Sequence, residues 1–149
     1  MNNLYVFCGA PGSGKTTISN KFTKEYNAIR YSFDEMKCTR YSDIIPYITK
    51  SLHDGNNVVV DALFKTLEQR KEILSAIKGI ECKKTLIFIN TSLDECIHRN
   101  AQRAKPLSSF MVECIYNSIE QPTIDEGWDE IIVIDNNKNL ENIENLNLL

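Results

Sequence analysis

The sequence predicts an α/β fold in which a five-stranded parallel sheet is covered by helices on both faces. Segments typical of strands alternate with segments typical of helices five times along the chain, a pattern that favours a parallel sheet. The segment Asn57–Asp61 has a wholly apolar centre, as a strand covered on both faces requires. Outside one glycine-rich loop, the remaining glycines, Gly55, Gly79 and Gly127, fall between the expected elements.

Apolar runs and helical spacing define the elements of the first half of the chain. Ile18, Phe22 and Tyr26 are spaced as on one face of a helix, and Gly55 is placed to end a second helix that tolerates Pro46 near its start. The expected elements are a strand at 4–7, a helix from about 15, a strand at 28–33, a helix at 42–53 and a strand at 57–61.

Helix-capping residues mark the elements of the second half. Thr66 with Gln69, and Ser92 with Glu95, have the spacing of capping boxes, and Pro106 interrupts the helical pattern that follows. The expected elements are a helix from 66 to 79, a strand at 85–90, a helix from 92 to about 103, a helix at 110–119, a strand at 128–135 and a closing helix or tail at about 137–149.

Length and composition bound the organisation of the protein. At 149 residues we expect a single domain, 1–149, with one core. The net charge of -3 argues against a broad basic surface that coats nucleic acid. Five cysteines without a C-x-x-C pair, no long apolar run and no room for a signal peptide predict a cytoplasmic protein that does not enter a membrane. The oligomeric state is left open.

The glycine-rich loop from Gly9 to Thr16 fits the phosphate-binding pattern G-x-x-x-x-G-K-[ST] between a strand and a helix. Its glycines allow successive backbone N–H groups to face an anion, and the following helix adds the positive end of its dipole. Lys15 is expected to contact the β- and γ-phosphates, and the Thr16 hydroxyl to ligate Mg²⁺. The expected nucleotide-binding residues here are Gly9, Ala10, Pro11, Gly12, Ser13, Gly14, Lys15, Thr16 and Thr17.

Two aspartates follow predicted strands, at the edge where ligands bind in such sheets. A kinase needs a carboxylate that accepts the proton of the attacking hydroxyl, and Asp34 has the position for this role. Asp61 closes an otherwise apolar strand and is a candidate metal ligand beside Thr16. Alternatively, both aspartates are simply polar residues where loops start, with Asp34 as a helix cap.

Arg99 and Arg103 are four residues apart, so they project from one face of a helix. Arginines in such a place can stabilise the charge that develops during phosphoryl transfer. A solvated basic helix end, to which Lys105 also belongs, is the alternative interpretation.

The sequence assigns no catalytic or metal-binding role to three further residues. Arg70 is expected to be an exposed partner of Glu68 or Glu72, and His53 and His98 lack a second ligand at metal spacing.

Together these motifs resemble the polynucleotide kinase-like phosphate-loop kinases, a family that includes the kinase domain of phage polynucleotide 5′-hydroxyl kinases. The resemblance runs from about Leu4 to Asp135 and rests on the glycine-rich loop, Asp34, Asp61 with Arg70 nine residues later, and the segments 99–103 and 121–130. It implies the strand order 2-3-1-4-5, Asp34 as general base, and a helical lid at about 99–110. It also implies that Arg103 contacts the phosphates and that Arg99 packs near adenine.

Two departures from the family pattern lie on the acceptor side. Three residues after Asp34, the family's kinases that act on nucleic acid tend to have arginine, and this chain has Lys37, with Arg40 nearby. Lysine holds a phosphate only as a point charge, without the bidentate fork of arginine. Two residues after Asp61 the family often has asparagine, and here that residue is Leu63. Asp34, Lys37 and Arg40 are the expected acceptor-binding residues.

The sequence therefore predicts an ATP- and Mg²⁺-dependent kinase that transfers the γ-phosphate to a hydroxyl. A 5′-hydroxyl of DNA, RNA or a nucleotide is the leading acceptor. A small-molecule kinase for a nucleoside or sugar acid uses the same core, and a nucleotide-binding ATPase or switch without an acceptor is the alternative from another class. A local basic path for a nucleic acid backbone is expected along Lys21, Lys24, Arg30, Lys37 and Arg40.

Overall fold

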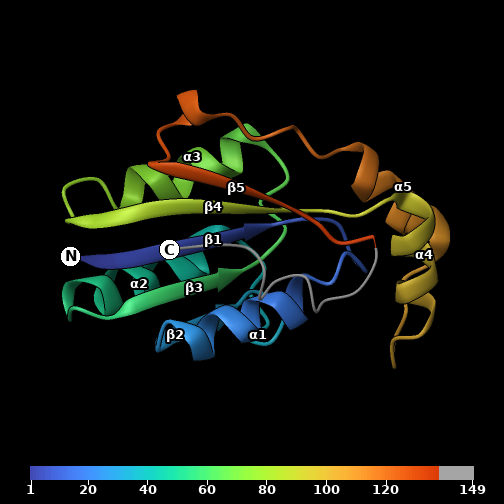
Figure 1. Cartoon of the computed structure of the whole chain (residues 1–149), viewed down its shortest axis with the longest axis horizontal. Coiled ribbons are helices and arrows are strands. Elements are labelled where there is room, and N and C mark those ends of the chain that lie inside the picture. The colour runs from blue at the N-terminus through green and yellow to red at the C-terminus, as the bar shows by residue number, and fades with distance from the viewer. Residues whose placement is uncertain (138–149) are drawn as a thin grey trace.

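The computed structural model describes residues 1–137, and most of the closing helix or tail expected at about 137–149 lies outside these residues. Within them, five parallel strands form one sheet in the order β2-β3-β1-β4-β5 (Figure 1). This order and direction confirm the predicted fold class. The strands are β1 (Asn2–Cys8), β2 (Ala28–Ser32), β3 (Asn57–Asp61), β4 (Cys82–Asn90) and β5 (Glu130–Asp135).

Helices cover both faces of the sheet, with α1 on one face and α2 and α3 on the other (Figure 1). Alternate residues of β1 divide between the two faces. Leu4 and Val6 pack in the cluster that holds Ile48 of α2, and Phe7 packs against Phe22 of α1. Each such side chain contributes about 1.5–3 kcal/mol by leaving water. The helices are α1 (Lys15–Glu25), α2 (Tyr41–His53), α3 (Leu67–Ala76), α4 (Leu93–Ala101) and α5 (Ser109–Asn117), with a 3₁₀ turn η1 (Ile124–Glu126).

Helices α4 and α5 lie beyond the carboxyl end of the sheet (Figure 1). The connection between them falls in the segment expected to be the lid. Asn100 fixes this connection, because its side-chain amide donates to the Leu107 carbonyl and accepts from the Leu107 N–H. The parallel register brings the ends of β1, β3 and β4 together, with Phe7 opposite both Asp61 and Ile87. Loops from several parts of the chain therefore meet at one edge.

Every strand except β3 has bounds that differ from those expected. Strand β1 extends from Asn2 to Cys8 instead of 4–7, and β2 ends at Ser32 instead of Phe33. Strand β4 starts at Cys82 instead of Thr85, because Cys82 to Lys84 pair with the first residues of β1. Strand β5 starts at Glu130, whereas Trp128 packs in the core with only 4% of its surface exposed. Across residues 1–137, we find no helix that combines the length and the hydropathy needed to cross a lipid bilayer.

Candidate active site

The phosphate loop, residues 9–16, connects β1 to α1 in a tight path that depends on two glycines. Gly12 and Gly14 have φ angles of 80° and 96°, a region that residues with a side chain rarely adopt. A Cβ atom on Gly12 would lie 2.2 Å from the Cys96 carbonyl oxygen of α4. Glycine at this position is therefore needed both for the turn and for the close approach of α4.

The carbonyl oxygen of Ser13 anchors the phosphate loop. It accepts hydrogen bonds from the Thr91 hydroxyl at 2.9 Å, from the Asn136 amide at 2.8 Å and from Arg99 Nη1 at 3.1 Å. Sequence reasoning missed Thr91 and Asn136, although each directly follows a strand at the edge where ligands are expected. These three donors hold the loop in shape from the α4 side of the sheet.

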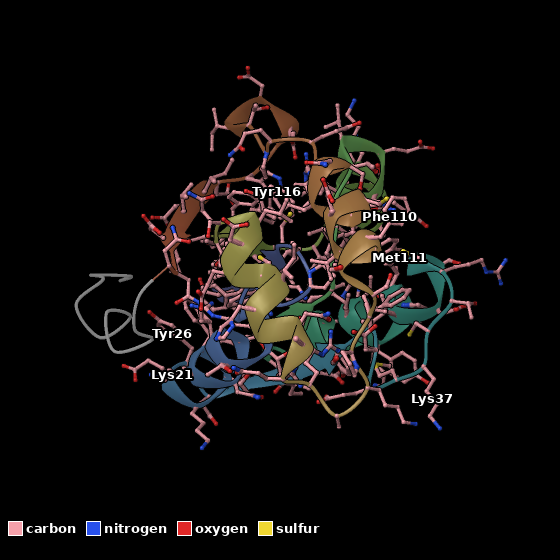
Figure 2. The ribbon with its side chains drawn as sticks, turned by 90° about the vertical axis from the view of Figure 1, so that its right-hand side faces the viewer. Lys21, Tyr26, Lys37, Phe110, Met111 and Tyr116 are labelled. Carbon is pink, nitrogen blue, oxygen red and sulfur yellow. The ribbon has the colours of Figure 1, made fainter. Side chains whose placement is uncertain are left out.

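A cavity of about 930 Å³ opens beside the phosphate loop at the carboxyl end of the sheet. Figure 2 looks onto this end, with α4 and α5 in front. The cavity has the size of a small-molecule or cofactor site. The predicted catalytic, nucleotide-binding, metal-binding and acceptor-binding residues that line it are Ala10, Pro11, Gly12, Gly14, Lys15, Thr16, Thr17, Asp34, Arg99 and Arg103, and Lys21 of the expected basic path lines it too.

Five sequence-predicted residues do not line this cavity: Gly9, Ser13, Asp61, Lys37 and Arg40. Gly9 and Ser13 are buried within the phosphate loop. Lys37 and Arg40 are exposed in the loop before α2, and Figure 2 shows Lys37 pointing away from the molecule. Arg40 lies 3.9 Å from Asp43, the third residue of α2.

Asp61 lies behind the phosphate loop in an ion-pair network. Its Oδ1 atom is 3.4 Å from Lys15 Nζ, and its Oδ2 atom is 2.5 Å from Arg30 Nη2 and accepts from the Ser19 hydroxyl at 3.2 Å. Only 4% of its side chain is exposed. Burial raises the pKa of Asp61, but the charges and hydrogen bonds of Lys15 and Arg30 outweigh this effect and leave the pKa below its ordinary value. The carboxylate is therefore ionised at neutral pH.

The donor set fits Mg²⁺ bound together with a triphosphate. Thr16 lines the cavity next to Lys15, and Asp61 adds a buried carboxylate at the end of β3. Within residues 1–137, no group of three or more histidine, cysteine or acidic side chains is placed to hold a metal alone. Mg²⁺ commonly takes one or two protein oxygens and completes its octahedron with phosphate and water. Thr16 would supply one such oxygen at the cavity, and Asp61, whose oxygens contact Lys15, Arg30 and Ser19, would supply a second once Lys15 moves away.

Asp34 lies in the turn after β2, where Lys37 N–H donates to the Asp34 carbonyl at 3.0 Å. Its side chain is exposed and lines the same cavity as Lys15 and Thr16. In the described part of the chain, no hydrogen bond or ion pair holds its carboxylate. The carboxylate is therefore accessible to a molecule inside the cavity.

Arg99 and Arg103 both line the cavity but differ in their contacts. Besides Ser13, Arg99 donates to the Asn136 carbonyl at 2.6 Å and to Glu95 at 2.9 Å, and only 22% of its side chain is exposed. Arg103 lies just beyond the end of α4 and is exposed. Arg99 thus ties α4 to the phosphate loop, whereas Arg103 is an exposed residue that lines the cavity.

The expectation for Arg70 was wrong. Its side chain is fully buried and pairs with neither Glu68 nor Glu72. It binds Glu126 through two hydrogen bonds, of 2.8 and 3.0 Å, and donates to the Phe64 carbonyl at 2.8 Å. Glu126 is 56 residues further along the chain, so no local pattern around Arg70 indicates this partner.

Comparison with known proteins finds a family and several structures of the same fold. The family model described as AAA domain, AAA_33, matches residues 4–114. A gluconokinase from Sinorhizobium meliloti 1021 is 16% identical, with a TM-score of 0.70 over 95% of this chain and 86% of that chain. Deoxyadenosine kinase from M. mycoides is 15% identical, with a TM-score of 0.60 over 96% of this chain and 95% of that chain.

A third similar structure is the Pnkp1/Rnl/Hen1 RNA repair complex. It is 19% identical, with a TM-score of 0.66 over 78% of this chain and 43% of that chain. At these identities the three likenesses show the shared fold and leave the acceptor undetermined.

Proposed function

The chain belongs to the AAA domain family AAA_33, and from this premise we propose that it is a kinase which transfers the γ-phosphate of ATP to a hydroxyl of a small molecule. The observation that carries the proposal is that Lys15, Thr16 and Asp34 line one cavity. A phosphate-binding loop and an accessible carboxylate are the two parts that transfer to an alcohol requires.

In the proposed reaction, the acceptor oxygen bonds to the γ-phosphorus while the bond between that phosphorus and the bridging oxygen of ADP breaks. Asp34 accepts the hydroxyl proton, and ADP leaves with the electron pair of the broken bond. Mg²⁺, when bound, neutralises charge on the β- and γ-phosphate oxygens. The backbone N–H groups of residues 9–16 and the Lys15 ammonium hold the same phosphates.

Lys15 changes partner in this scheme. Its contact with Asp61 is 3.4 Å long, which is longer than the usual 2.7–2.9 Å of a charge-assisted hydrogen bond. Arg30 remains on Asp61 at 2.5 Å and keeps that carboxylate compensated when Lys15 moves to a phosphate. The proposed role of Asp61 is thus to hold Lys15 before the nucleotide binds and to face the metal afterwards.

Arg103 is proposed to contact the transferring phosphate. It is exposed, it lines the cavity and it lies on the connection between α4 and α5. A small movement of this connection towards the phosphate loop would bring a cation to the charge that develops there. Arg99, already bound to Ser13 and Asn136, is proposed to keep the loop in shape and to form one wall of the nucleotide site.

The basic residues expected to guide a nucleic acid offer little support for such an acceptor. Arg30 binds Asp61, Glu35 and Ser19, so its charge is already compensated. Lys37 and Arg40 lie outside the cavity, and Lys21 is the one member of the expected basic path that lines it. Binding of a nucleic acid depends on several available cations along its backbone. We therefore favour a nucleoside, a sugar or a sugar acid over a polynucleotide 5′-hydroxyl as the acceptor.

An acceptor panel tests this proposal. The protein is incubated with γ-labelled ATP, Mg²⁺ and either a nucleoside, a sugar acid or a 5′-hydroxyl oligonucleotide, with Lys15→Ala as the control variant. We expect label on a small molecule and none with Lys15→Ala. Label on the oligonucleotide, with transfer that falls steeply as salt rises, would establish the polynucleotide reaction instead. Release of labelled phosphate without a labelled acceptor would indicate an ATPase.

A further inference from the structure

We propose that Arg70 is a positioning residue that sets the acceptor side of the cavity through the carbonyl oxygen of Phe64, an inference that rests on the proposed kinase function. Arg70 itself does not line the cavity. Its influence on the reaction would pass through the turn between β3 and α3, residues 62–66, which we call the β3–α3 turn.

Arg70 carries its charge in the protein interior, where the loss of hydration makes a charge energetically unfavourable. Its side chain is 0% exposed and that of its partner Glu126 is 3% exposed. A buried ion pair of this kind often contributes no more stability than apolar side chains of similar volume would. The ion pair alone therefore does not explain why position 70 holds an arginine. The additional hydrogen bond from Arg70 to the Phe64 carbonyl offers an explanation.

Phe64 has an unusual backbone. Its φ angle is 43°, which is uncommon for a bulky residue and persists only where the surrounding structure imposes it. Its carbonyl accepts from Arg70 at 2.8 Å and from the Cys8 thiol at 3.4 Å. Its N–H donates to the Tyr41 hydroxyl at 3.0 Å. Helices α2 and α3 and strand β1 therefore all hold this one residue.

The β3–α3 turn connects this buried point to the reacting groups. Leu63, next to Phe64, lines the cavity, and Asp61 at the end of β3 contacts Lys15. On the other side, the Tyr41 ring packs on Phe64 with centroids 4.5 Å apart and on Phe33 with centroids 5.1 Å apart. Phe33 directly precedes Asp34. A displaced Phe64 would therefore shift both the cavity wall at Leu63 and the turn that carries Asp34.

The guanidinium group suits this position better than an ammonium. It donates to Glu126 through Nε and Nη2 while Nη1 donates to Phe64. The planar, rigid fork makes these contacts at once, whereas lysine offers a compact charge on a flexible stem. Glu126 in turn also accepts from the Thr123 N–H and the Trp128 indole.

The test compares four variants of the full chain. Arg70→Met leaves the Glu126 charge unpaired, and Arg70→Lys keeps a charge without the fork. The double variant Arg70→Met with Glu126→Gln removes both charges, and the one glutamine oxygen still offers an acceptor to either the Thr123 N–H or the Trp128 indole, which bind different oxygens of Glu126. Lys71→Met, on the exposed side of the same helix, is the matched control. Unfolding in urea, the dissociation constant of ATP, and kcat and KM for the labelled acceptor are measured for each.

We expect the double variant to recover most of the stability lost in Arg70→Met, since no buried charge is left unpaired. Its kcat/KM for the acceptor should nevertheless stay at least about tenfold below that of the wild type, because small displacements of reacting groups are costly. Binding of ATP should change by less than about twofold. Compared with Arg70→Met, Arg70→Lys should recover little of the kcat/KM for the acceptor. Recovery of kcat/KM together with stability in the double variant would mean that Arg70 is only structural.

An activity-independent measurement separates this proposal from the kinase assignment. Hydrogen exchange of the Phe64 amide, which donates to Tyr41, should be strongly protected in the wild type and lose that protection in the double variant. Unchanged exchange would overturn the positioning role even if phosphate transfer is found. Failure of the wild type to label any acceptor, with faster Phe64 exchange in the variant, would instead refute the kinase function alone.

Discussion

Asp61 links the phosphate loop to Arg30 of β2 and, through it, to the turn that follows β2. It contacts Lys15 on one side and Arg30 on the other. Arg30 also binds Glu35, the residue next to Asp34, at 2.7 Å. A series of ion pairs thus connects Lys15, through Asp61, Arg30 and Glu35, with the turn that contains Asp34.

Substitution of Asp34 by asparagine tests its role as the base. Asp34→Asn keeps the shape of the exposed side chain but removes its ability to accept the proton. We expect kcat to fall by roughly 10²-fold or more, with the dissociation constant of ATP unchanged. Glu25→Gln, at the exposed end of α1, is the control. Normal turnover of Asp34→Asn would place the base elsewhere.

Arg103→Ala should slow transfer more than it weakens nucleotide binding. The reason is that its guanidinium is proposed to act on charge that develops only as the phosphate moves. We expect a loss of about 10-fold or more in kcat, measured in single-turnover reactions at saturating ATP. A variant that loses only ATP affinity would show that Arg103 binds the ground state.

The helices and strands differ in how directly the sequence specifies them. Strand β3 was predicted with its observed bounds because its residues are buried on both faces and show a continuous apolar run. The Thr66 capping box was also predicted and is confirmed, because both partners lie within one helical turn. Ser92 caps α4 as expected, but Glu95 binds Arg99 instead of completing a box.

Other features depend on contacts that no local pattern contains. Lys83 and Lys84 resemble loop residues, yet their backbones extend β4 where their side chains can reach solvent. The burial of Arg70 depends on Glu126, and the compensation of Arg30 depends on Asp61, 31 residues away. The motif and the strand-end rule indicated Lys15, Thr16 and Asp34, which line one cavity, whereas the contact of Lys15 with Asp61, 46 residues further along the chain, depends on the fold.

The Thr66 cap should contribute measurably to stability. Its hydroxyl accepts from the Gln69 N–H at 3.2 Å at the start of α3. We expect Thr66→Ala to lower the free energy of unfolding in urea by about 1 kcal/mol. Thr49→Ala, whose exposed hydroxyl donates only to the preceding turn of α2, is the control. Equal effects of the two substitutions would show that the cap is not what stabilises α3.

Glu126 should make the free energy of unfolding depend on pH under acidic conditions. Burial raises the pKa of Glu126, but hydrogen bonds from Arg70, Thr123 and Trp128 and the charge of Arg70 outweigh it, so the pKa lies below its ordinary value of 4.5. The stabilisation is thus present above that value and is lost as pH falls through the lower pKa of the folded protein. The stability difference between wild type and Glu126→Gln should be constant near neutral pH and shrink below about 4.5. A difference that stays constant as the pH falls well below 4.5 would contradict this prediction.

Binding of the proposed nucleotide should stabilise the whole folded protein against thermal unfolding. A ligand that binds only the folded chain at 100 times its dissociation constant adds about 2.7 kcal/mol. For a domain of this size that raises the unfolding temperature by several degrees, roughly 2–4 °C per kcal/mol. We expect ADP with Mg²⁺ to produce this shift in calorimetry and Lys15→Ala to lose most of it. An equal shift in both proteins would show that ADP binds away from the phosphate loop.

The direction of the central strand has a practical consequence for handling the protein. Strand β1 begins at Asn2, next to the exposed Met1, and runs its seven residues towards the cavity. At about 3.3 Å per residue this separates the amino terminus from the phosphate loop by roughly 20 Å. A fusion partner, dye or surface anchor attached at Met1 would therefore leave the cavity beside the phosphate loop accessible. Turnover could then be measured on immobilised or single molecules without redesign of the chain.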